Sequence, residues 1–317
     1  MSNSFGTLFR ITDFGESHGA AVGGVIDGCP AGLEIDLDFV NEELRRRAPS
    51  HDELSTERHE PDSVKFLSGI RDSKTLGTPI AFLVMNRDVK ADSANNQVIK
   101  PSHASFVYME KYGHEDNYGS GRASARQTVC RVVAGAIAKL LLKRHGIKIT
   151  SALAAPLRPC PPDDTIGAKV RVSVSGVPAG LGEPVYDKLD ARLAYAMLSI
   201  NAAKGFELGA GFHAADMLGS EYNDRQTSGF KFLSNNDGGV QAGISNGQEI
   251  FFTVAFKPIP TLRLEQQTVD FNGQPAVYKG NSRNDRCVYP RVLPVVEAMT
   301  ALVLADFLLQ RNAEQIL

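Results

Sequence analysis

The hydrophobic positions of the chain alternate between short strand-like runs and three long helical segments. The expected helices are Ala125–Arg144, Asp187–Ala203 and Pro294–Arg311, with Gly205 ending the second. Apolar residues occupy most faces of the first and third helices, and a helix that is apolar all round is buried. Runs of β-branched and aromatic residues predict strands at Thr7–Phe14, Val22–Asp27, Ile80–Met85, Lys169–Ser175, Glu249–Phe256 and Leu262–Val269. We therefore expect the helices between layers, with sheets outside.

One sequence pattern occurs twice. Residues 24–44 and residues 171–193 each read as a strand-like run, a Gly-x-Pro-Ala-Gly-Leu loop and an acidic helix start. The loops Gly28–Leu33 and Gly176–Leu181 agree at five of six positions. Such repetition favours a duplicated unit over chance reuse of turn residues. No low-complexity linker separates the copies, so we expect a single domain, residues 1–317, built from two intertwined related halves.

The start of the first long helix carries an unusual concentration of positive charge. Ser124 and Gln127 have the spacing of a capping box, which places the helix N-terminus at Ser124. Arg122 and Arg126 lie at this end, although a helix N-terminus already carries about half a positive charge. Free amides and guanidinium groups together suit a bound anion. The alternative is that both arginines pair with local carboxylates, such as Glu115 or Asp116.

Composition narrows the class of protein. The 317 residues are 43% hydrophobic and 22% charged, with a net charge of −2 and no basic tail, so neither nucleic acid nor a membrane surface is an expected partner. The N-terminus does not resemble a signal peptide, and we expect no apolar stretch of membrane-spanning length. Four scattered cysteines predict reduced thiols, a cytoplasmic location and no metal site.

Several turns carry side chains that could do chemistry. His18, in the turn Phe14–Gly19, could serve as a general acid or base, although a histidine in a turn is more often structural. His103 occupies a second stiff turn, Lys100–Ala104. Asp285 lies between two guanidinium groups in the loop Ser282–Cys287, which could equally be a salt-bridged surface loop.

Two further basic segments are candidates for anion contacts. The arginines Arg45–Arg47 cannot all face one way, because successive helical side chains point about 100° apart. One or two of them could reach an anion, and a solvated helix end is the alternative. The segment Lys257–Thr261 ends a strand with a lysine and a hydroxyl, which suits a phosphate. The chain has no dinucleotide fingerprint, no P-loop and no serine elbow.

Taken together, the motifs resemble the chorismate synthase family over nearly the whole chain. The motifs occur in the family's order and are FGESHG at Phe14–Gly19, RHEPD at Arg58–Asp62, GTPI at Gly77–Ile80, PSHA at Pro101–Ala104, KYG…GSGRASARQT…RVVAGAIAK from Lys111 to Lys139, SGVPAGLGEPV at Ser175–Val185, SINAAKGFELGAGF at Ser199–Phe212, GSEYND at Gly219–Asp224, GGVQAGISNG at Gly238–Gly247, KPIPT at Lys257–Thr261 and RVLPVVEAM at Arg291–Met299.

The resemblance implies an α+β fold, a β-α-β sandwich with a central helical layer between two antiparallel sheets, assembled as a homotetramer. It also implies a lyase of the shikimate pathway of aromatic amino-acid biosynthesis. Chorismate synthases remove phosphate from 5-enolpyruvylshikimate 3-phosphate by anti 1,4-elimination, and they require reduced FMN although the reaction has no net redox change. In the accepted picture the flavin supplies electron density, and its N5 receives the proton lost from carbon 6.

The resemblance also implies roles for individual residues. His18 matches the histidine that protonates the leaving phosphate, and His103 matches the one that manages the proton on reduced flavin. Asp285 matches an aspartate near flavin N5, and Arg283 matches its neighbour that contacts both flavin and substrate. The residues that match substrate-binding arginines are Arg47 and Arg126, and those that match the FMN shell are Arg122, Ala123, Ser124, Asn201, Ala202, Ala242, Lys257, Pro258, Ile259, Pro260 and Thr261.

The chain departs from the family pattern in several supporting groups. The usual Arg-His-Asp-Pro-Cys reads Arg283–Cys287 with Asn284 and Arg286, and we expect Arg286 to lie beside Asp285 and make it a weaker base. The other departures are Lys100 for arginine, Ser105 for aspartate, Glu53 for arginine and a short stretch between Ile149 and Asp164.

These departures leave three alternatives open. The chain is a working chorismate synthase, an inactive FMN-binding paralogue, or a flavin-dependent lyase acting on another phosphorylated cyclohexene. Whether it reduces its own flavin with NADPH also stays open, and Glu53 argues against that activity.

Overall fold

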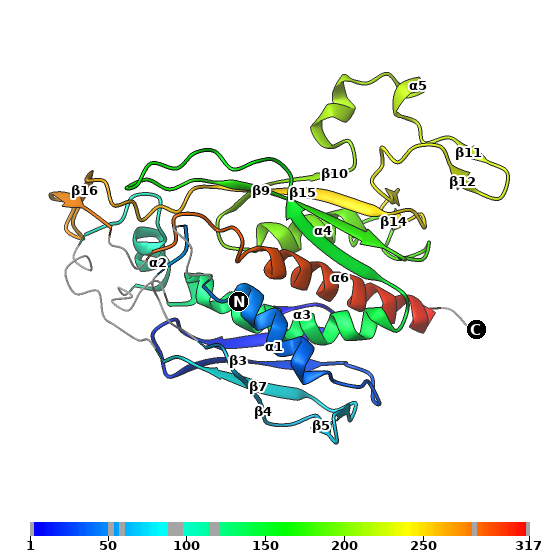
Figure 1. Cartoon of the computed structure of the whole chain (residues 1–317), viewed down its shortest axis with the longest axis horizontal. Coiled ribbons are helices and arrows are strands. Elements are labelled where there is room, and N and C mark those ends of the chain that lie inside the picture. Colours follow the sequence, from blue (N-terminus) through cyan, green and yellow to red (C-terminus); the bar gives the residue numbers. More distant parts are fainter. Residues whose placement is uncertain are drawn as a thin grey trace.

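The protein is a three-layer sandwich in which helices lie between two antiparallel sheets (Figure 1). The structure, a computed structural model, describes residues 3–49, 54–56, 61–87, 98–113, 121–280 and 284–314. The first sheet has the order β1-β2-β3-β7-β4, with β1 Ser4–Phe5, β2 Arg10–Gly15, β3 Ala21–Asp27, β7 Ile80–Met85 and β4 Val64–Phe66. The second has the order β10-β15-β9-β8, with β10 Ala203–Leu208, β15 Ile250–Phe256, β9 Ala168–Ser175 and β8 Lys148–Leu153.

The middle layer consists of four helices, α1 Leu37–Arg47, α3 Thr128–Lys143, α4 Leu189–Leu198 and α6 Leu293–Glu314. Helix α3 packs against α6 and touches the first sheet, and α6 packs against β8 and β9 of the second sheet. Both α3 and α6 begin on the same side of the molecule, the left side in Figure 1. The predicted α+β sandwich with a central helical layer is therefore confirmed.

Smaller elements decorate this body. The remaining elements are the hairpins β5 Ile70–Arg71 with β6 Lys74–Thr75, β11 Gln226–Thr227 with β12 Lys231–Phe232, β13 Val240–Gln241 with β14 Ile244–Ser245 and β16 Gln266–Val269 with β17 Pro275–Tyr278, the helices α2 Ser105–Tyr112 and α5 Gly219–Tyr222, and the 3₁₀ turns η1 Gly121–Ala123, η2 Ala125–Gln127 and η3 Gly211–Asp216. The arm that carries α5 and the β11–β12 hairpin projects away from the body (Figure 1).

The two sheets repeat one topology, which is the internal duplication expected from the sequence. In the first sheet, the hairpin β2–β3 is followed by α1, and β7 then pairs between β3 and β4. In the second sheet, the hairpin β8–β9 is followed by α4, and β15 pairs between β9 and β10. Each copy is followed by one of the two central helices, α3 or α6. We infer from this repetition one domain made of two intertwined halves.

The duplication extends to single hydrogen bonds. In the loop of the first half, the hydroxyl of Thr75 accepts the amide of Leu33 at 2.9 Å. In the second half, the hydroxyl of Ser245 accepts the amide of Leu181 at 2.9 Å. Each hydroxyl then donates, at 2.6 Å, to the carbonyl of the proline in its loop. The repeated Gly-x-Pro-Ala-Gly-Leu sequence thus encodes one loop conformation, fastened twice to an equivalent hairpin.

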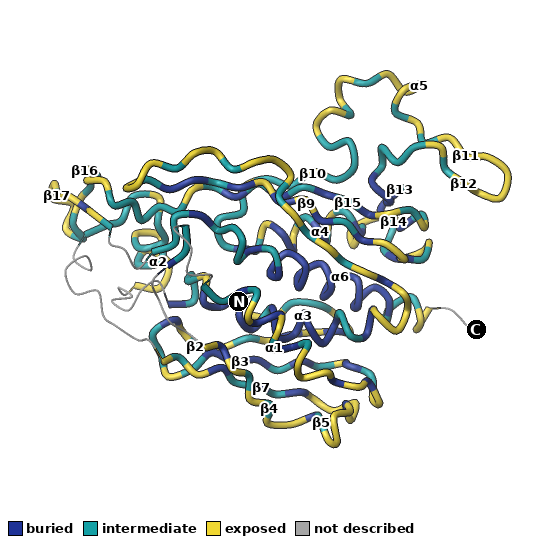
Figure 2. Tube along the Cα trace, viewed as in Figure 1, coloured by how far each residue is buried: buried dark blue, intermediate teal, exposed yellow. Residues whose placement is uncertain are grey.

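The core lies in the helical layer and on the inner faces of both sheets (Figure 2). In β7, the alternating residues Ile80, Phe82 and Val84 are fully buried, as expected for a strand with one face on a core. In α6, every residue from Pro294 to Leu308 is buried. The two helices that are apolar on most faces are therefore buried between the sheets, as their composition predicted.

Helix α6 corrects one expectation about apolar stretches. Among the described residues, it is long and apolar enough to cross a membrane by length and composition. The sequence-based expectation that no stretch reaches this length was therefore wrong. Of its most apolar window, however, 83% is buried inside the protein, as in the core helix of a globular fold.

The second long helix is shorter than predicted. Helix α4 ends at Leu198, and Gly205 lies in strand β10, where it pairs with Ala255 across a β-bulge. Between them, Ala202 adopts a positive φ of 67° and turns the chain into the strand. The glycine marks an irregularity in a strand, a role that glycine also commonly has.

The close approach of α3 and α6 yields a testable expectation. A Cβ added to Gly135 on α3 would lie 2.3 Å from the Cβ of Ala298 on α6. Alanine for glycine inside a helix normally stabilises by about 1 kcal/mol. Here we expect Gly135→Ala to destabilise the protein by about 1–3 kcal/mol, because the two helices must separate. Urea unfolding checks this, with Gly219→Ala as the control, because no atom lies within 4 Å of that added Cβ. A stabilised Gly135→Ala protein would contradict the tight crossing.

Candidate active site

The segment that precedes α3 is the centre of the candidate site. Two 3₁₀ turns, Gly121–Ala123 and Ala125–Gln127, bring the chain to Thr128, where α3 begins. The hydroxyl of Ser124 accepts the amide of Arg126 at 3.3 Å. The side chain of Gln127 donates instead to the carbonyl of Gly15, at 2.7 Å. The predicted capping box is therefore wrong, because strand β2 engages the glutamine and the tighter turn brings a different amide to the hydroxyl.

Two buried arginines share one buried carboxylate beside this segment. Nη1 of Arg47 donates to Oδ2 of Asp62 at 2.9 Å, and Nη1 of Arg126 donates to Oδ1 of the same residue. The three side chains are 5%, 3% and 1% exposed, in the order Arg47, Arg126, Asp62. Arg47 also donates to Thr128 Oγ1 at 3.1 Å and to the carbonyl of Ala125 at 3.2 Å, which joins α1 to the start of α3.

Among the described residues, the guanidinium groups of Arg47, Arg126 and Arg291 outnumber the carboxylates of Asp62 and Asp285 with which they pair. The pKa of Arg47 is lowered to about 10, first by burial and then by the neighbouring cations Arg291 and Arg126, which together outweigh Asp62. A buried cationic excess is unfavourable unless an anion compensates it. The start of a long helix also offers amide groups and a positive dipole end. Arg47 and Arg126 are therefore placed to bind an anionic group of a ligand.

Arg122 behaves differently from Arg126. Its Nη2 pairs with Oδ1 of Asp13, and its Nη1 donates to Gln127 Oε1 at 2.9 Å and to the carbonyl of Gly15 at 3.3 Å. Both arginines thus pair with carboxylates, but Asp13 and Asp62 are distant in the sequence and are not the local partners that the alternative interpretation named. Glu115 and Asp116 lie outside the described residues. Among the described residues, Asp13 pairs with Arg122 alone, whereas Asp62 is shared by Arg126 and Arg47.

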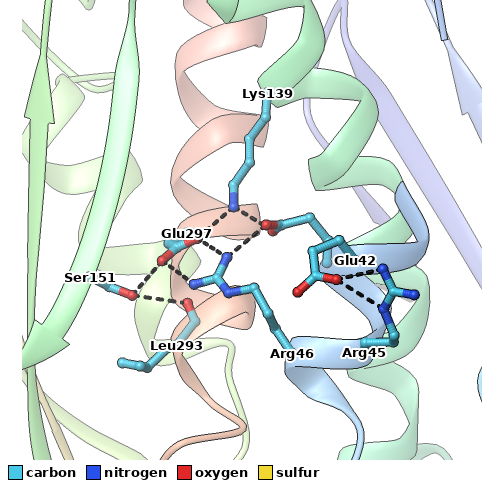
Figure 3. A network of polar contacts seen from close by, with 8 residues as sticks. Glu42, Arg45, Arg46, Lys139, Ser151, Leu293 and Glu297 are labelled. Atoms are coloured by element: carbon cyan, nitrogen blue, oxygen red, sulfur yellow. Dashed lines mark hydrogen bonds and ion pairs between the residues drawn. The ribbon is translucent and has the colours of Figure 1, made fainter. Parts of the chain in front are cut away.

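The three consecutive arginines at the end of α1 point in three directions, as the helical spacing predicted. Arg45 pairs with Glu42 on the surface, and Arg47 is buried with Asp62. Arg46 donates to Glu297 Oε1 and Oε2, at 2.7 Å each, in a network that includes Lys139 (Figure 3). This network joins α1, α3 and α6, so Arg46 holds together the helices that carry the site.

The His18 turn is fastened to the arginine cluster through one asparagine. Nδ2 of Asn86 donates to the carbonyls of Glu16, at 3.0 Å, and Gly19, at 2.8 Å, on either side of His18. Oδ1 of the same amide accepts Nε of Arg126 at 2.8 Å. Asn86 directly follows strand β7 and so fixes the turn after β2 against the start of α3. His18 is half-buried, and its Nδ1 is buried.

Among the described residues, the carboxylate of Asp285 accepts hydrogen bonds from Thr56 and Arg291. Its Oδ1 accepts the amide of Thr56 at 2.9 Å, and its Oδ2 accepts Nη1 of Arg291 at 2.5 Å. The guanidinium of Arg286 donates to the carbonyls of Cys160, Pro161 and Asp164, which belong to the short stretch before β9. Among the described residues, the cation that pairs with Asp285 is thus Arg291, and Arg286, its neighbour in sequence, anchors the shortened segment.

The groups around His103 determine which of its ring nitrogens carries a proton. The amide of Ser105 donates to Nδ1 of His103 at 3.3 Å, so the neutral ring carries its proton on Nε2. Ser105 Oγ accepts the amide of Lys100 at 3.2 Å and closes the turn. The pKa of His103 is lowered from 6.5 to about 4 by burial and then by the cations Lys100 and Lys257. At neutral pH, His103 therefore presents an uncharged N–H donor.

The lowered pKa of His103 predicts how stability depends on pH. Between pH 6.5 and about 4, the unfolded chain binds a proton at this histidine and the folded protein does not. The free energy of unfolding should therefore fall as pH decreases through this window, and His103→Asn should remove this part of the dependence. Following the ¹³Cε1 shift of His103 against pH tests the assignment. Lys257→Met should raise the pKa, because one repelling cation is lost, and a midpoint near 6.5 in the wild type would contradict the buried neutral histidine.

Several residues expected to surround a flavin are linked by hydrogen bonds to the segment that precedes α3 and to the His103 turn. Asn201 Nδ2 donates to the carbonyl of Ala123 at 2.7 Å. The amide of Lys257 donates to the carbonyl of Ala202 at 2.9 Å, and its Nζ donates to the carbonyl of Ser102, next to His103, at 3.1 Å. The stretch from Lys257 to Thr261 is thus linked to both the His103 turn and the start of α3.

One predicted residue lies elsewhere. Ala242, with a φ of 52°, occupies the turn between β13 and β14. The amide of Leu189, the first residue of α4, donates to the carbonyl of the adjacent Gly243, whereas Asn201 follows the other end of α4. Ten helical residues span about 15 Å, so Ala242 is not brought to the remaining flavin candidates within one chain.

Some residues were missed by the sequence analysis, and some lie outside the described ranges. Arg283 and Glu53 belong to the latter. The missed residues are Asp62, Asn86 and Arg291. Asp62 was visible as the last residue of the Arg58–Asp62 motif. Arg291 stands two residues before α6, as Arg126 stands two residues before α3. The duplication was therefore a usable signal for Arg291, whereas only the fold reveals the role of Asn86.

Comparison with known proteins identifies the family. The profile of the family described as chorismate synthase matches residues 9–156 and 161–309, and it is interrupted inside the stretch expected to be short. Chorismate synthases of Christiangramia forsetii and Parabacteroides distasonis are 47% and 46% identical, and each alignment covers 99% of both chains. A crystal structure described as chorismate synthase is similar, with a TM-score of 0.76 and 30% identity over 96% of this chain and 93% of that one. The chain belongs to the chorismate synthase family.

Proposed function

We propose that the protein is a lyase that eliminates phosphate from 5-enolpyruvylshikimate 3-phosphate to give chorismate, with reduced FMN as its cofactor. The observation that carries this proposal is the buried pair Arg47 and Arg126 sharing Asp62 at the start of α3. The substrate carries a phosphate and two carboxylates. Guanidinium groups bind both kinds of anion through paired N–H donors. A site that gathers buried guanidinium groups matches such a substrate better than it matches a neutral one.

The residues divide the work of the elimination. Arg47 and Arg126 bind and orient anionic groups, and Asn86 holds the His18 turn beside them. His18 protonates the leaving phosphate oxygen as general acid. Asp285 presents an ionisable carboxylate whose position is fixed by Thr56 and Arg291. His103 stays neutral and offers Nε2–H as a hydrogen-bond donor.

The chain also offers groups that suit a flavin. The hydroxyl Oγ1 of Thr261 is buried, and no residue of the described ranges forms a hydrogen bond with it, which fits a partner that the chain does not supply. Lys257, four residues before Thr261, donates to the carbonyl of Ser102, and the carbonyl of Ala123 accepts Nδ2 of Asn201. We propose that these residues hold FMN, with Asn201 and Ala202 supporting the loop. When bound there, reduced flavin would supply electron density to the substrate and would take up the proton lost from carbon 6.

The departures from the family pattern fall on supporting contacts. Ser105 replaces an acid but still closes the Lys100 turn, and Arg286 replaces a proline but anchors the short stretch of Cys160–Asp164. These replacements form contacts of their own, which supports a working enzyme over an inactive paralogue. We infer further that the protein is a cytoplasmic homotetramer, in which the exposed Phe212 and Phe230 of the projecting arm suit contacts between subunits.

An anaerobic assay tests the proposed function. The protein is mixed with dithionite-reduced FMN and 5-enolpyruvylshikimate 3-phosphate, and chorismate absorbance and free phosphate are followed together. Equal amounts of both products, formed only when reduced flavin is present, are expected. A parallel titration with FMN, read by fluorescence quenching, should show tighter binding when substrate is added. Binding without product would favour the inactive paralogue, and neither binding nor product would overturn the proposal.

A further inference from the structure

We propose that Arg291 is a positioning residue of this lyase, which holds the carboxylate of Asp285 against the anion-binding end of α1. Nε of Arg291 donates to the backbone carbonyl of Arg47 at 3.0 Å, and Nη1 donates to Asp285 Oδ2 at 2.5 Å. One planar group therefore joins a substrate-binding candidate to a catalytic candidate. The inference rests on the proposed function, because it concerns the geometry of the same reaction.

The Arg291 side chain supplies hydrogen-bond donors to two acceptors, the backbone carbonyl of Arg47 and the carboxylate of Asp285. Arg47 is the last residue of α1, and the final carbonyls of a helix lack partners within the helix. Asp285 lies in a loop, where its only other contact among the described residues is the amide of Thr56. A guanidinium presents its donors in a fixed fork, so both contacts are set by one side chain. An ammonium at the end of a flexible stem cannot reproduce that fork.

The position of Arg291 follows from the internal duplication. Arg126 stands two residues before α3, Arg291 stands two residues before α6, and the two helices begin on the same side of the molecule (Figure 1). Each half thus delivers one arginine to the same region. Arg126 reaches Asp62, which is 1% exposed and shared with Arg47, whereas Arg291 reaches Asp285, which is 23% exposed. The arginine of the second half therefore pairs with a more exposed carboxylate than the arginine of the first half does.

Arg291 also adds to the positive charge around Arg47. It is the first of the neighbouring cations that lower the pKa of Arg47. Its own guanidinium is 17% exposed, so water screens it only partly. Removing it should relieve repulsion at Arg47 while releasing Asp285. For substrate binding, the relieved repulsion at Arg47 and the released carboxylate of Asp285 act in opposite directions. The position of Asp285 is lost without compensation, so we expect the main loss in kcat.

The test compares Arg291→Lys and Arg291→Ala with the wild type in the anaerobic assay. We expect kcat to fall about 10- to 100-fold in Arg291→Lys, because a displacement of about 1 Å in a reacting group can cost that much. KM for the substrate and the FMN affinity should change less than threefold. Guanidinium chloride should partly restore kcat in Arg291→Ala, and sodium chloride at the same ionic strength should not. Arg192→Lys, which changes a partly exposed arginine near Asp187, is the matched control.

A double-mutant cycle separates positioning from general stabilisation. If Arg291 acts through Asp285, Arg291→Lys should have almost no further effect on kcat in an Asp285→Asn background. Full additivity of the two losses, wild-type kcat in Arg291→Lys, or a loss that tracks thermal unfolding without guanidinium rescue would each overturn the proposal. Absence of chorismate from the wild type would instead overturn the proposed function, so the two failures are distinguishable.

Discussion

Asp62→Asn is expected to lower the free energy of unfolding by about 3–5 kcal/mol, because it removes the carboxylate that two buried guanidinium groups share. Arg47 and Arg126 are 5% and 3% exposed, so water cannot replace the lost charge. The amide is similar in size to the carboxylate, and therefore the effect reports on charge. Urea unfolding at pH 7 measures it, and inorganic phosphate should restore part of the loss if the vacated site accepts an anion.

The matched control is Asp13→Asn, which removes the partner of Arg122. The side chains of that pair are 15% and 25% exposed, so water screens it partly and the loss should be smaller, about 1–2 kcal/mol. Equal losses in both variants would mean that Asp62 is an ordinary ion-pair partner. A large loss in Asp62→Asn that phosphate leaves unchanged would show that the cluster is structural and does not bind anions.

His18→Asn is expected to lower kcat about 10²- to 10⁴-fold, because general acid catalysis contributes about that much. The asparagine keeps a polar group of similar reach but cannot donate a proton to the leaving phosphate. KM should change little, since Asn86 anchors the turn through backbone carbonyls of Glu16 and Gly19. Steady-state kinetics under anaerobic conditions measure the split between kcat and KM.

His145→Asn provides the control for that variant. His145 is exposed in the turn after α3, at the end of the helix opposite the site. It should leave both kinetic constants unchanged. If His18→Asn keeps at least a third of the wild-type kcat, the histidine has the structural role that is more common for a turn, and another group protonates the leaving phosphate.

The fold was predictable because its signals are local and repeated. The apolar faces of α3 and α6 placed these helices in the core, and the repeated Gly-x-Pro-Ala-Gly-Leu loop announced the duplication that both sheets follow. The predicted end of α4 was wrong, because it relied on Gly205 as a helix end, whereas glycine also occurs at bulges within strands. Helix propensity could not tell the two uses apart.

The site was predictable in its anion-binding character but not in its pairings. Arg126 at a helix start indicated an anion, yet its partner Asp62 is 64 residues away, and only the sheet brings them together. Likewise, the sequence placed Arg286 beside Asp285 but gave no sign that Arg291, six residues further on, forms the ion pair with it. Residue types reveal the available charges, but long-range packing decides which charges meet.

The most direct test of the anion site is the substrate affinity of two arginine variants, measured by calorimetric titration. Arg126→Ala should weaken binding of 5-enolpyruvylshikimate 3-phosphate by about 2–5 kcal/mol, because a buried charge partner of the ligand is lost. Arg122→Ala should weaken it far less, since Asp13 already neutralises that arginine. Thermal unfolding of both proteins provides the stability reference. Unchanged affinity in Arg126→Ala together with a collapse of its thermal stability would contradict the account and make Arg126 a structural residue.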